Sequence, residues 1–148
     1  MRVEFKIDPN IGEPFAVIHA PKITPELVVW AEVLEGAKDK SSPLMVTKED
    51  KIFLIGPEQI DIIRTEGGDV KIYNREAQKY IILKPLHEIQ ERLGRGFFRI
   101  SKSSIVNISR IDHLSQSFNG TMYIVMKNGV SDYVSRKYIS DFKKRFDI

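Results

Sequence analysis

A short polar group in the C-terminal third of the sequence carries side chains suited to contact with phosphates and base edges. Residues 97–111 form the segment FFRISKSSIVNISRI, in which apolar residues flank Ser-Lys-Ser-Ser at positions 101–104. The apolar residues can anchor the segment to a core, so the pattern predicts a fixed turn that carries hydroxyls and one long cation. Hydroxyls donate hydrogen bonds to phosphate, and lysine reaches the acceptors of guanine in the major groove. An ordinary surface turn is the alternative interpretation.

A second group with similar chemistry lies near the C-terminus. Ser135 precedes Arg136 and Lys137, and the apolar residues Ile139 and Phe142 follow at helical spacing. Serine is a favoured N-cap residue, so the pattern predicts a helix that starts at Ser135. The N-terminus of a helix attracts phosphate through its free N–H groups and its dipole. The sequence therefore predicts an anion-binding helix end beside two cations.

The distribution of charge along the chain agrees with a polyanionic partner. Residues 95–148 contain 10 Lys/Arg and 4 Asp/Glu, which gives +6, whereas residues 51–94 contain 7 of each. Residues 1–50 contain 6 Lys/Arg and 9 Asp/Glu, which gives −3, so the net charge of +3 comes from the last third. Such asymmetry favours a polyanion on one side of the molecule, with a merely solvated basic surface as the alternative.

Residues that could carry catalysis or hold a metal are scattered in the sequence. The histidines stand alone: His19, His87 and His113. There is no cysteine, which excludes disulfides, thiol nucleophiles and cysteine zinc sites. The sequence has no G-x-S-x-G, Walker or G-x-G-x-x-G motif. We therefore expect no enzyme, no cofactor and no metal.

Segments typical of β-strands dominate from Leu44 onward. Several runs of four to eight residues are rich in β-formers and are separated by turn residues. Two short helices interrupt them, one that starts at Pro85 and stops at Gly94, and one that starts at Ser135. Dense strands without a β-α-β rhythm predict a mainly antiparallel β domain.

Two Asn-Gly pairs predict hairpins in the C-terminal half. Asn119-Gly120 and Asn128-Gly129 each stand between strand-like runs. Such pairs are typical of type I′ turns, which need positive φ at both residues. The sequence therefore predicts a meander from about Arg110 to Val134.

The first 42 residues follow another pattern. Residues 3–7 and 15–20 predict two strands, and Thr24 with Pro25 predicts the N-cap and first residue of a helix. The helix has one apolar stripe, which includes Trp30. These residues therefore predict a short β-β-α segment at 1–42.

A polar stretch marks the domain boundary. Residues 37–43, AKDKSSP, predict a linker, so the sequence divides into the N-terminal segment 1–42 and a domain at 43–148. We expect the N-terminal segment to pack on the domain or to form a dimerisation surface.

Apolar runs are too short for insertion into a membrane. The longest run, LVVWA, ends at Ala31, whereas a membrane span needs about 20 apolar residues. The N-terminus, MRVEFKIDP, lacks the apolar region of a secretory signal. We therefore expect a cytoplasmic protein without membrane insertion.

The domain at 43–148 resembles the LytTR family of bacterial DNA-binding domains. The family pattern is an F-x-R-I segment with a following V-N, then I-x-x-I, an N-G hairpin and S-R-x-Y. The matching residues are Phe98, Arg99, Ile100, Ser103, Val106, Asn107, Ile111, Asn128, Gly129, Ser135, Arg136 and Tyr138. Two separate blocks at the right spacing make the resemblance specific.

The resemblance implies a mainly β fold of about ten short antiparallel strands with small helices, whose loops enter successive major grooves. It places base-reading side chains in three loops, and the candidates are Asp69, Ser101, Lys102 and Lys137. It also implies neighbours that contact phosphate or position the loops, and these candidates are Arg99, Ser103, Ser135 and Arg136. The family usually has His at the position of Ser101 and Arg or Asn at that of Lys102, so the base preference of relatives does not carry over to this chain.

The resemblance further implies a sequence-specific regulator of transcription that binds double-stranded DNA, with two copies on direct repeats. The segment 1–42 is too short for a receiver domain, so the chain resembles stand-alone members. Some of those are paired with a membrane protein that restrains them, and a homodimer is a further expectation. Two alternatives stay open. One is a protein-interaction module without specific DNA binding, and the other is a small metal-dependent nuclease that uses Asp61, Glu66 and Asp69.

Overall fold

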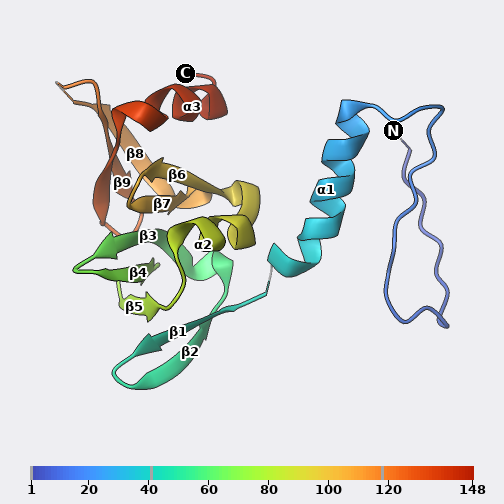
Figure 1. Ribbon diagram of the computed structural model, residues 1–148, viewed down its shortest axis with the longest axis horizontal. Helices are drawn as coiled ribbons and strands as arrows, with labels where there is room; N and C mark the ends of the chain where they lie inside the picture. Colours follow the sequence, from blue (N-terminus) through green and yellow to red (C-terminus); the bar gives the residue numbers. More distant parts are fainter. Residues whose placement is uncertain (1, 41, 118) are drawn as a thin grey trace. The chain divides into compact units, whose positions relative to one another are not determined.

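The computed structural model describes residues 2–40, 42–117 and 119–148 (Figure 1). These residues divide into two compact units, and the boundary lies between Gly36 and Ala37. No helix in the described part of the chain is both long and apolar enough to cross a membrane.

The N-terminal unit contains the start of helix α1 (Pro25–Lys40). The Thr24 hydroxyl accepts a hydrogen bond from the backbone N–H of Leu27 at 3.3 Å, which confirms Thr24 as the N-cap. The helix continues to Lys40 through most of the predicted linker, because Ala37, Lys38 and Lys40 are good helix formers. The linker prediction was therefore wrong for 37–40, and its residue 41 lies outside the described residues.

The two strands predicted in the N-terminal segment are not found in its described residues. Residues 3–7 and 15–20 have no ladder partner, and their apolar side chains, such as Phe5 and Phe15, are exposed. A strand needs paired backbone groups and a buried face, and these residues have neither. The β-β part of the predicted β-β-α segment was therefore wrong, whereas the helix was correct.

The second unit is mainly β, as predicted, and its described residues form ten strands in two antiparallel sheets. The larger sheet has the order β2-β1-β5-β4-β3-β7-β6, and the smaller has the order β10-β9-β8. Their bounds are β1 (Leu44–Lys48), β2 (Lys51–Ile55), β3 (Ile60–Glu66), β4 (Asp69–Asn74), β5 (Lys79–Ile82), β6 (Phe97–Ser101), β7 (Ser104–Asn107), β8 (Ile111–Gln116), β9 (Met122–Met126) and β10 (Ser131–Val134). Helices α2 (Leu86–Leu93) and α3 (Arg136–Phe146) complete the unit.

The larger sheet has a core on each face. Helix α2 buries Leu86, Ile89 and Leu93 against one face, together with Ile63 of β3. The smaller sheet and Phe142 of α3 pack on the opposite face, around Ile62 and Val106. Strand β3 contributes to both cores, with Ile63 in one and Ile62 in the other.

The hairpin turn at Gly129 differs in type from the prediction. Gly129 has φ 88°, but Asn128 does not have positive φ. The N–H of Gly129 donates to the Met126 carbonyl at 2.9 Å, as in a three-residue loop that ends in a left-handed glycine. The hairpins were therefore predicted correctly, but the type I′ assignment of Asn128-Gly129 was wrong. The predicted turn at Asn119-Gly120 includes residue 118, which lies outside the described residues. Positive φ at two successive residues occurs instead at Glu49-Asp50 and at Gly67-Gly68.

Candidate nucleic-acid interface

The turn between β6 and β7 is held in place by Arg99. Its Nε donates a hydrogen bond to the Ser101 carbonyl at 2.7 Å, and its Nη2 donates to the Lys102 carbonyl. The N–H of Ser103 donates to the Ser101 hydroxyl at 3.2 Å, which tightens the turn further. The Arg99 guanidinium is thus engaged by the backbone of the turn.

The β3–β4 hairpin lies beside this turn. The N–H of Thr65, near the end of β3, donates to the Ser103 carbonyl at 2.9 Å. Residues 66–69 form the tip of this hairpin, and Asp69 is exposed at the first position of β4. Two of the three loops predicted to read bases are therefore neighbours in the structure.

The start of α3 lies at the same end of the β domain. The N–H of Ser135 donates to the Ile100 carbonyl at 2.8 Å, one residue before Ser101. Strand β10 therefore ends beside the end of β6, and α3 begins there. The structure thus brings all three predicted loops together, although they are far apart in the sequence.

Two lysines at this end are available for a ligand. Lys102 lies in the β6–β7 turn and Lys137 in the first turn of α3, and both side chains are exposed. Neither forms a hydrogen bond or an ion pair with a described residue, although the Lys137 ammonium lies 5.8 Å from the ring centre of Tyr138. Long exposed cations beside fixed backbone fit contact with a nucleic acid.

Arg136 and Ser135 differ in what their side chains do for the structure. The Arg136 Nε donates to the Asn119 carbonyl at 2.6 Å, which ties the β8–β9 loop to α3. Ser135 occupies the N-cap position with φ −71° and ψ 157°, as predicted, but its side chain makes no capping hydrogen bond. The Ser135 hydroxyl therefore accepts no hydrogen bond from the backbone N–H groups at the start of α3.

A cluster of charged and polar side chains beneath the interface was not predicted. It consists of Arg64, Glu66, Tyr73, Ser104 and Asp132, here called the Arg64 cluster. Arg64 donates from Nε to Glu66 at 3.0 Å and from Nη2 to the Tyr73 hydroxyl at 3.2 Å. Its members come from four strands, so no local sequence pattern could reveal it.

Within the Arg64 cluster, Glu66 is held in its charged form. The Tyr73 hydroxyl lies 2.7 and 2.6 Å from its two carboxylate oxygens, and Lys79 lies 4.0 Å away. Burial alone would raise the pKa of Glu66, but the hydrogen bond from Tyr73 and the nearby cations outweigh it. The pKa of Glu66 is therefore lowered from its ordinary value.

The nuclease alternative requires three carboxylates, and the structure pairs Glu66 with Asp69 across the β3–β4 hairpin but keeps Asp61 apart from them. Asp61 is fully buried and accepts hydrogen bonds from Arg110 Nε at 2.7 Å and from the N–H of Asn128 at 3.0 Å. Asp61 and Glu66 lie near opposite ends of β3. Within residues 2–40, 42–117 and 119–148, no group of three His, Asp or Glu side chains is placed to hold a metal ion.

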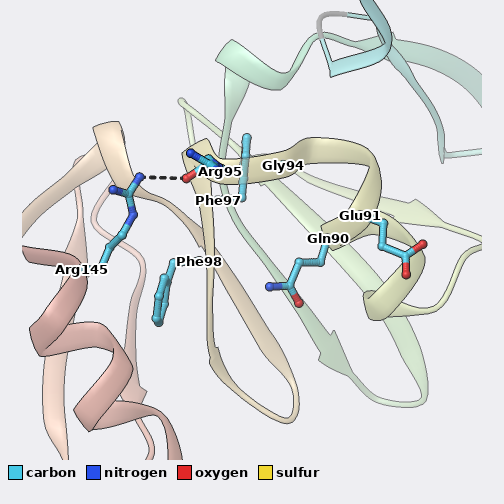
Figure 2. Close-up of a pocket in the computed structure, with 7 residues that line it drawn as sticks. All are labelled: Gln90, Glu91, Gly94, Arg95, Phe97, Phe98 and Arg145. Carbon is cyan, nitrogen blue, oxygen red and sulfur yellow. Dashed lines mark hydrogen bonds between the residues drawn. The ribbon is translucent and has the colours of Figure 1, made fainter. Parts of the chain in front are cut away.

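A shallow pocket of about 530 Å³ lies at the other end of β6. Its lining residues are Gln90, Glu91, Gly94, Arg95, Phe97, Phe98 and Arg145. Figure 2 shows Arg145 reaching toward the backbone of Arg95, where its Nη2 donates to the carbonyl at 3.1 Å. Because β6 runs from Phe97 to Ser101, this pocket is separate from the interface formed by the loops.

The chain is similar to known regulators over its β domain. The family model of the LytTr DNA-binding domain matches residues 50–147. The chain is 34% identical over 106 residues to the transcriptional regulatory protein LytR of Staphylococcus aureus, which is 71% of this chain and 42% of LytR. It is 29% identical over 110 residues to the sensory transduction protein LytT of Enterococcus faecalis, which is 74% of this chain and 45% of LytT. The chain thus spans less than half the length of these two relatives.

A further relative and a solved structure extend the comparison. An uncharacterized HTH-type transcriptional regulator of Staphylococcus aureus is 29% identical over 148 residues, which cover 100% of this chain and 99% of that protein. A LytTr DNA-binding domain from Bacillus cereus has the same fold, with a TM-score of 0.68 and 21% identity, over 72% of this chain and 98% of that domain. Because the family model matches most of the chain, the predicted resemblance is confirmed: this protein belongs to the LytTR family of DNA-binding domains.

Proposed function

We propose that the protein is a sequence-specific regulator of transcription that binds double-stranded DNA and reads the major groove through loops. The observation that carries the proposal is the convergence of three loops, two of which present the exposed cations Lys102 and Lys137, whose ammonium groups form no ion pair with a described residue. Backbone hydrogen bonds fix the loops where they meet, so this end of the β domain can present several side chains to a duplex at once.

The proposed roles differ between the side chains of the interface. Lys102, Lys137, Ser101 and Asp69 contact base edges, where lysine is matched to guanine acceptors and aspartate to the amino group of cytosine. Ser103 and Ser135 contact phosphates. Arg99 and Arg136 position the loops through the backbone carbonyls that they hold.

The proposed assembly has two copies of the protein on direct repeats in the DNA. A homodimer and a restraining membrane protein are further proposed partners, and the N-terminal segment 1–42 is the proposed surface for self-association. We place the protein in the cytoplasm, where a regulator of transcription meets bacterial DNA. In this proposal the protein has no catalytic activity of its own.

Selection of binding sites from random duplexes tests the proposed function. The selected duplex and a scrambled duplex are then titrated with the protein at one salt concentration, with and without magnesium. A clear preference for the selected duplex supports the proposal. Failure to bind any duplex would indicate an interaction module, and strand cleavage with magnesium would indicate a nuclease.

A further inference from the structure

We infer that Arg64 is a positioning residue for DNA recognition, which fixes the β3–β4 hairpin relative to β10 and the start of α3. The inference rests on the proposed function. Arg64 itself does not contact DNA in this proposal, but acts through the elements that it joins.

The contacts of Arg64 connect the two sheets. Its Nη1 donates to the Ser131 carbonyl at 3.0 Å and lies 3.6 Å from the Asp132 carboxylate, both in β10 of the smaller sheet. Its other two nitrogens bind Glu66 and Tyr73 of the larger sheet. The guanidinium carbon also lies 4.8 Å from the ring centre of Tyr73. All three guanidinium nitrogens are therefore engaged within the chain, which leaves Arg64 poorly suited to bind a phosphate.

A second contact reinforces the connection between the sheets. The Ser104 hydroxyl in β7 donates to the same Asp132 oxygen, Oδ2, at 2.7 Å. Asp132 is thus held from two strands of the larger sheet, because Arg64 and Ser104 are direct neighbours in the β3–β7 pair. The Asp132 carboxylate therefore helps to hold β10 against the larger sheet.

The Arg64 cluster lies next to each part of the interface. Thr65, the residue after Arg64, donates its N–H to the carbonyl of Ser103 in the β6–β7 turn. Ser135, three residues after Asp132, begins the segment that carries Lys137. A change in the Arg64–Asp132 contact is therefore expected to move Lys137 relative to Lys102.

The chemistry of arginine explains why this position needs more than a positive charge. The guanidinium is planar and donates in several fixed directions, whereas a lysine ammonium is a single point charge on a flexible stem. The Arg64 and Asp132 side chains are only 23% and 21% exposed, so solvent screens their contact less than that of a surface pair.

The decisive variant is Asp132→Asn, because an effect of charge and an effect of positioning would change the affinity for the selected duplex in opposite directions. If only overall charge mattered, the loss of a carboxylate near DNA would strengthen binding to every duplex. If Asp132 and Arg64 position the loops, affinity for the selected duplex falls by about tenfold, while affinity for the scrambled duplex stays the same or rises. Arg64→Lys keeps the positive charge. It is expected to lose the preference for the selected duplex over the scrambled one, while the salt dependence of its affinity stays unchanged.

Asp141→Asn is the matched control, since it makes the same change of charge as Asp132→Asn at an exposed residue of α3 outside the Arg64 cluster. It is expected to change binding to the two duplexes alike. Thermal unfolding verifies that each variant is folded, and Ser104→Ala, which alters no charge, replaces any variant that is not. Equal changes on both duplexes in the folded cluster variants, in either direction, would overturn the positioning role. Absence of any preference in the unmodified protein would count against the proposed function instead.

Discussion

The backbone N–H of Ser135 donates a hydrogen bond to the carbonyl oxygen of Ile100 at 2.8 Å, and this contact joins two segments that the sequence separates by a whole meander. It places the start of α3 beside the β6–β7 turn. Lys137 and Lys102 consequently lie on neighbouring segments of one end of the molecule, where a single duplex can meet both.

Replacement of either lysine tests whether it reads bases. Lys102→Ala and Lys137→Ala are each expected to cost about 1–3 kcal/mol of binding free energy on the selected duplex, and much less on a scrambled duplex. Lys51→Ala is the control, because Lys51 is exposed on the edge strand β2, at the opposite end of the sheet order from β6 and β7. Equal losses on the two duplexes would make the lysines phosphate contacts and move base reading to Ser101 or Asp69.

Replacement of Ser135 separates its binding role from a capping role. Since its side chain makes no capping hydrogen bond, Ser135→Ala should change the free energy of unfolding by less than about 0.5 kcal/mol, whereas a true cap costs about 1 kcal/mol. If its hydroxyl contacts phosphate, the variant should weaken binding to selected and scrambled duplexes alike. Urea unfolding measures the change in stability, and titration of the selected and scrambled duplexes measures the change in binding. Lost stability with unchanged binding would assign Ser135 to the fold alone.

The β domain was predictable because its signals are local. The apolar runs, the glycine at position 129 and the two blocks around Arg99 and Ser135 each depend on residues close in sequence. The strands predicted at 3–7 and 15–20 failed because β propensity acts only where a partner strand and a buried face exist.

The Arg64 cluster, in contrast, could not be predicted from the sequence. Arg64 and Asp132 are 68 residues apart, and the sequence 131–134 reads as an ordinary strand. Only the pairing of β3 with β7, and the packing of β10 against them, brings their charges within 3.6 Å. The family resemblance implied three base-reading loops, but only the structure shows that these loops lie together.

The turn at Gly129 offers a test of backbone strain without a change in packing. Gly129 has φ 88°, and a Cβ placed there would meet no atom within 4 Å. Gly129→Ala should therefore destabilise the protein by about 1 kcal/mol through the positive φ alone. Gly96→Ala is the control, because its Cβ would also meet nothing within 4 Å and its φ is not in the left-handed region. Equal melting temperatures for the two variants would contradict the assigned turn.

Salt dependence tests the contribution of phosphates to binding. If the positively charged region contacts about six phosphates, the logarithm of affinity should fall linearly with the logarithm of salt concentration, with a slope near −5. Lys102→Ala should reduce this slope by about one only if Lys102 contacts phosphate rather than a base. Titrations of the selected duplex at several salt concentrations give both values. A slope near zero for the unmodified protein would argue against DNA as the partner.

Glu66 should make the stability of the protein sensitive to acid. Its pKa is lowered in the folded state, so at acid pH the folded protein binds fewer protons at this group than the unfolded chain does. The stabilisation is complete above the ordinary pKa of glutamate, about 4.3, and is lost as the pH falls through the lower folded value.

Glu66→Gln removes this titration, so the free energy of unfolding should fall less between about pH 6 and about pH 3 in the variant than in the parent. Urea unfolding at the two pH values measures the difference. Glu76→Gln controls for the loss of one carboxylate, because Glu76 is exposed in the β4–β5 turn and has none of the contacts of Glu66. If the parent and Glu66→Gln lose the same stability on acidification, the contacts with Tyr73 and Arg64 do not hold the carboxylate charged.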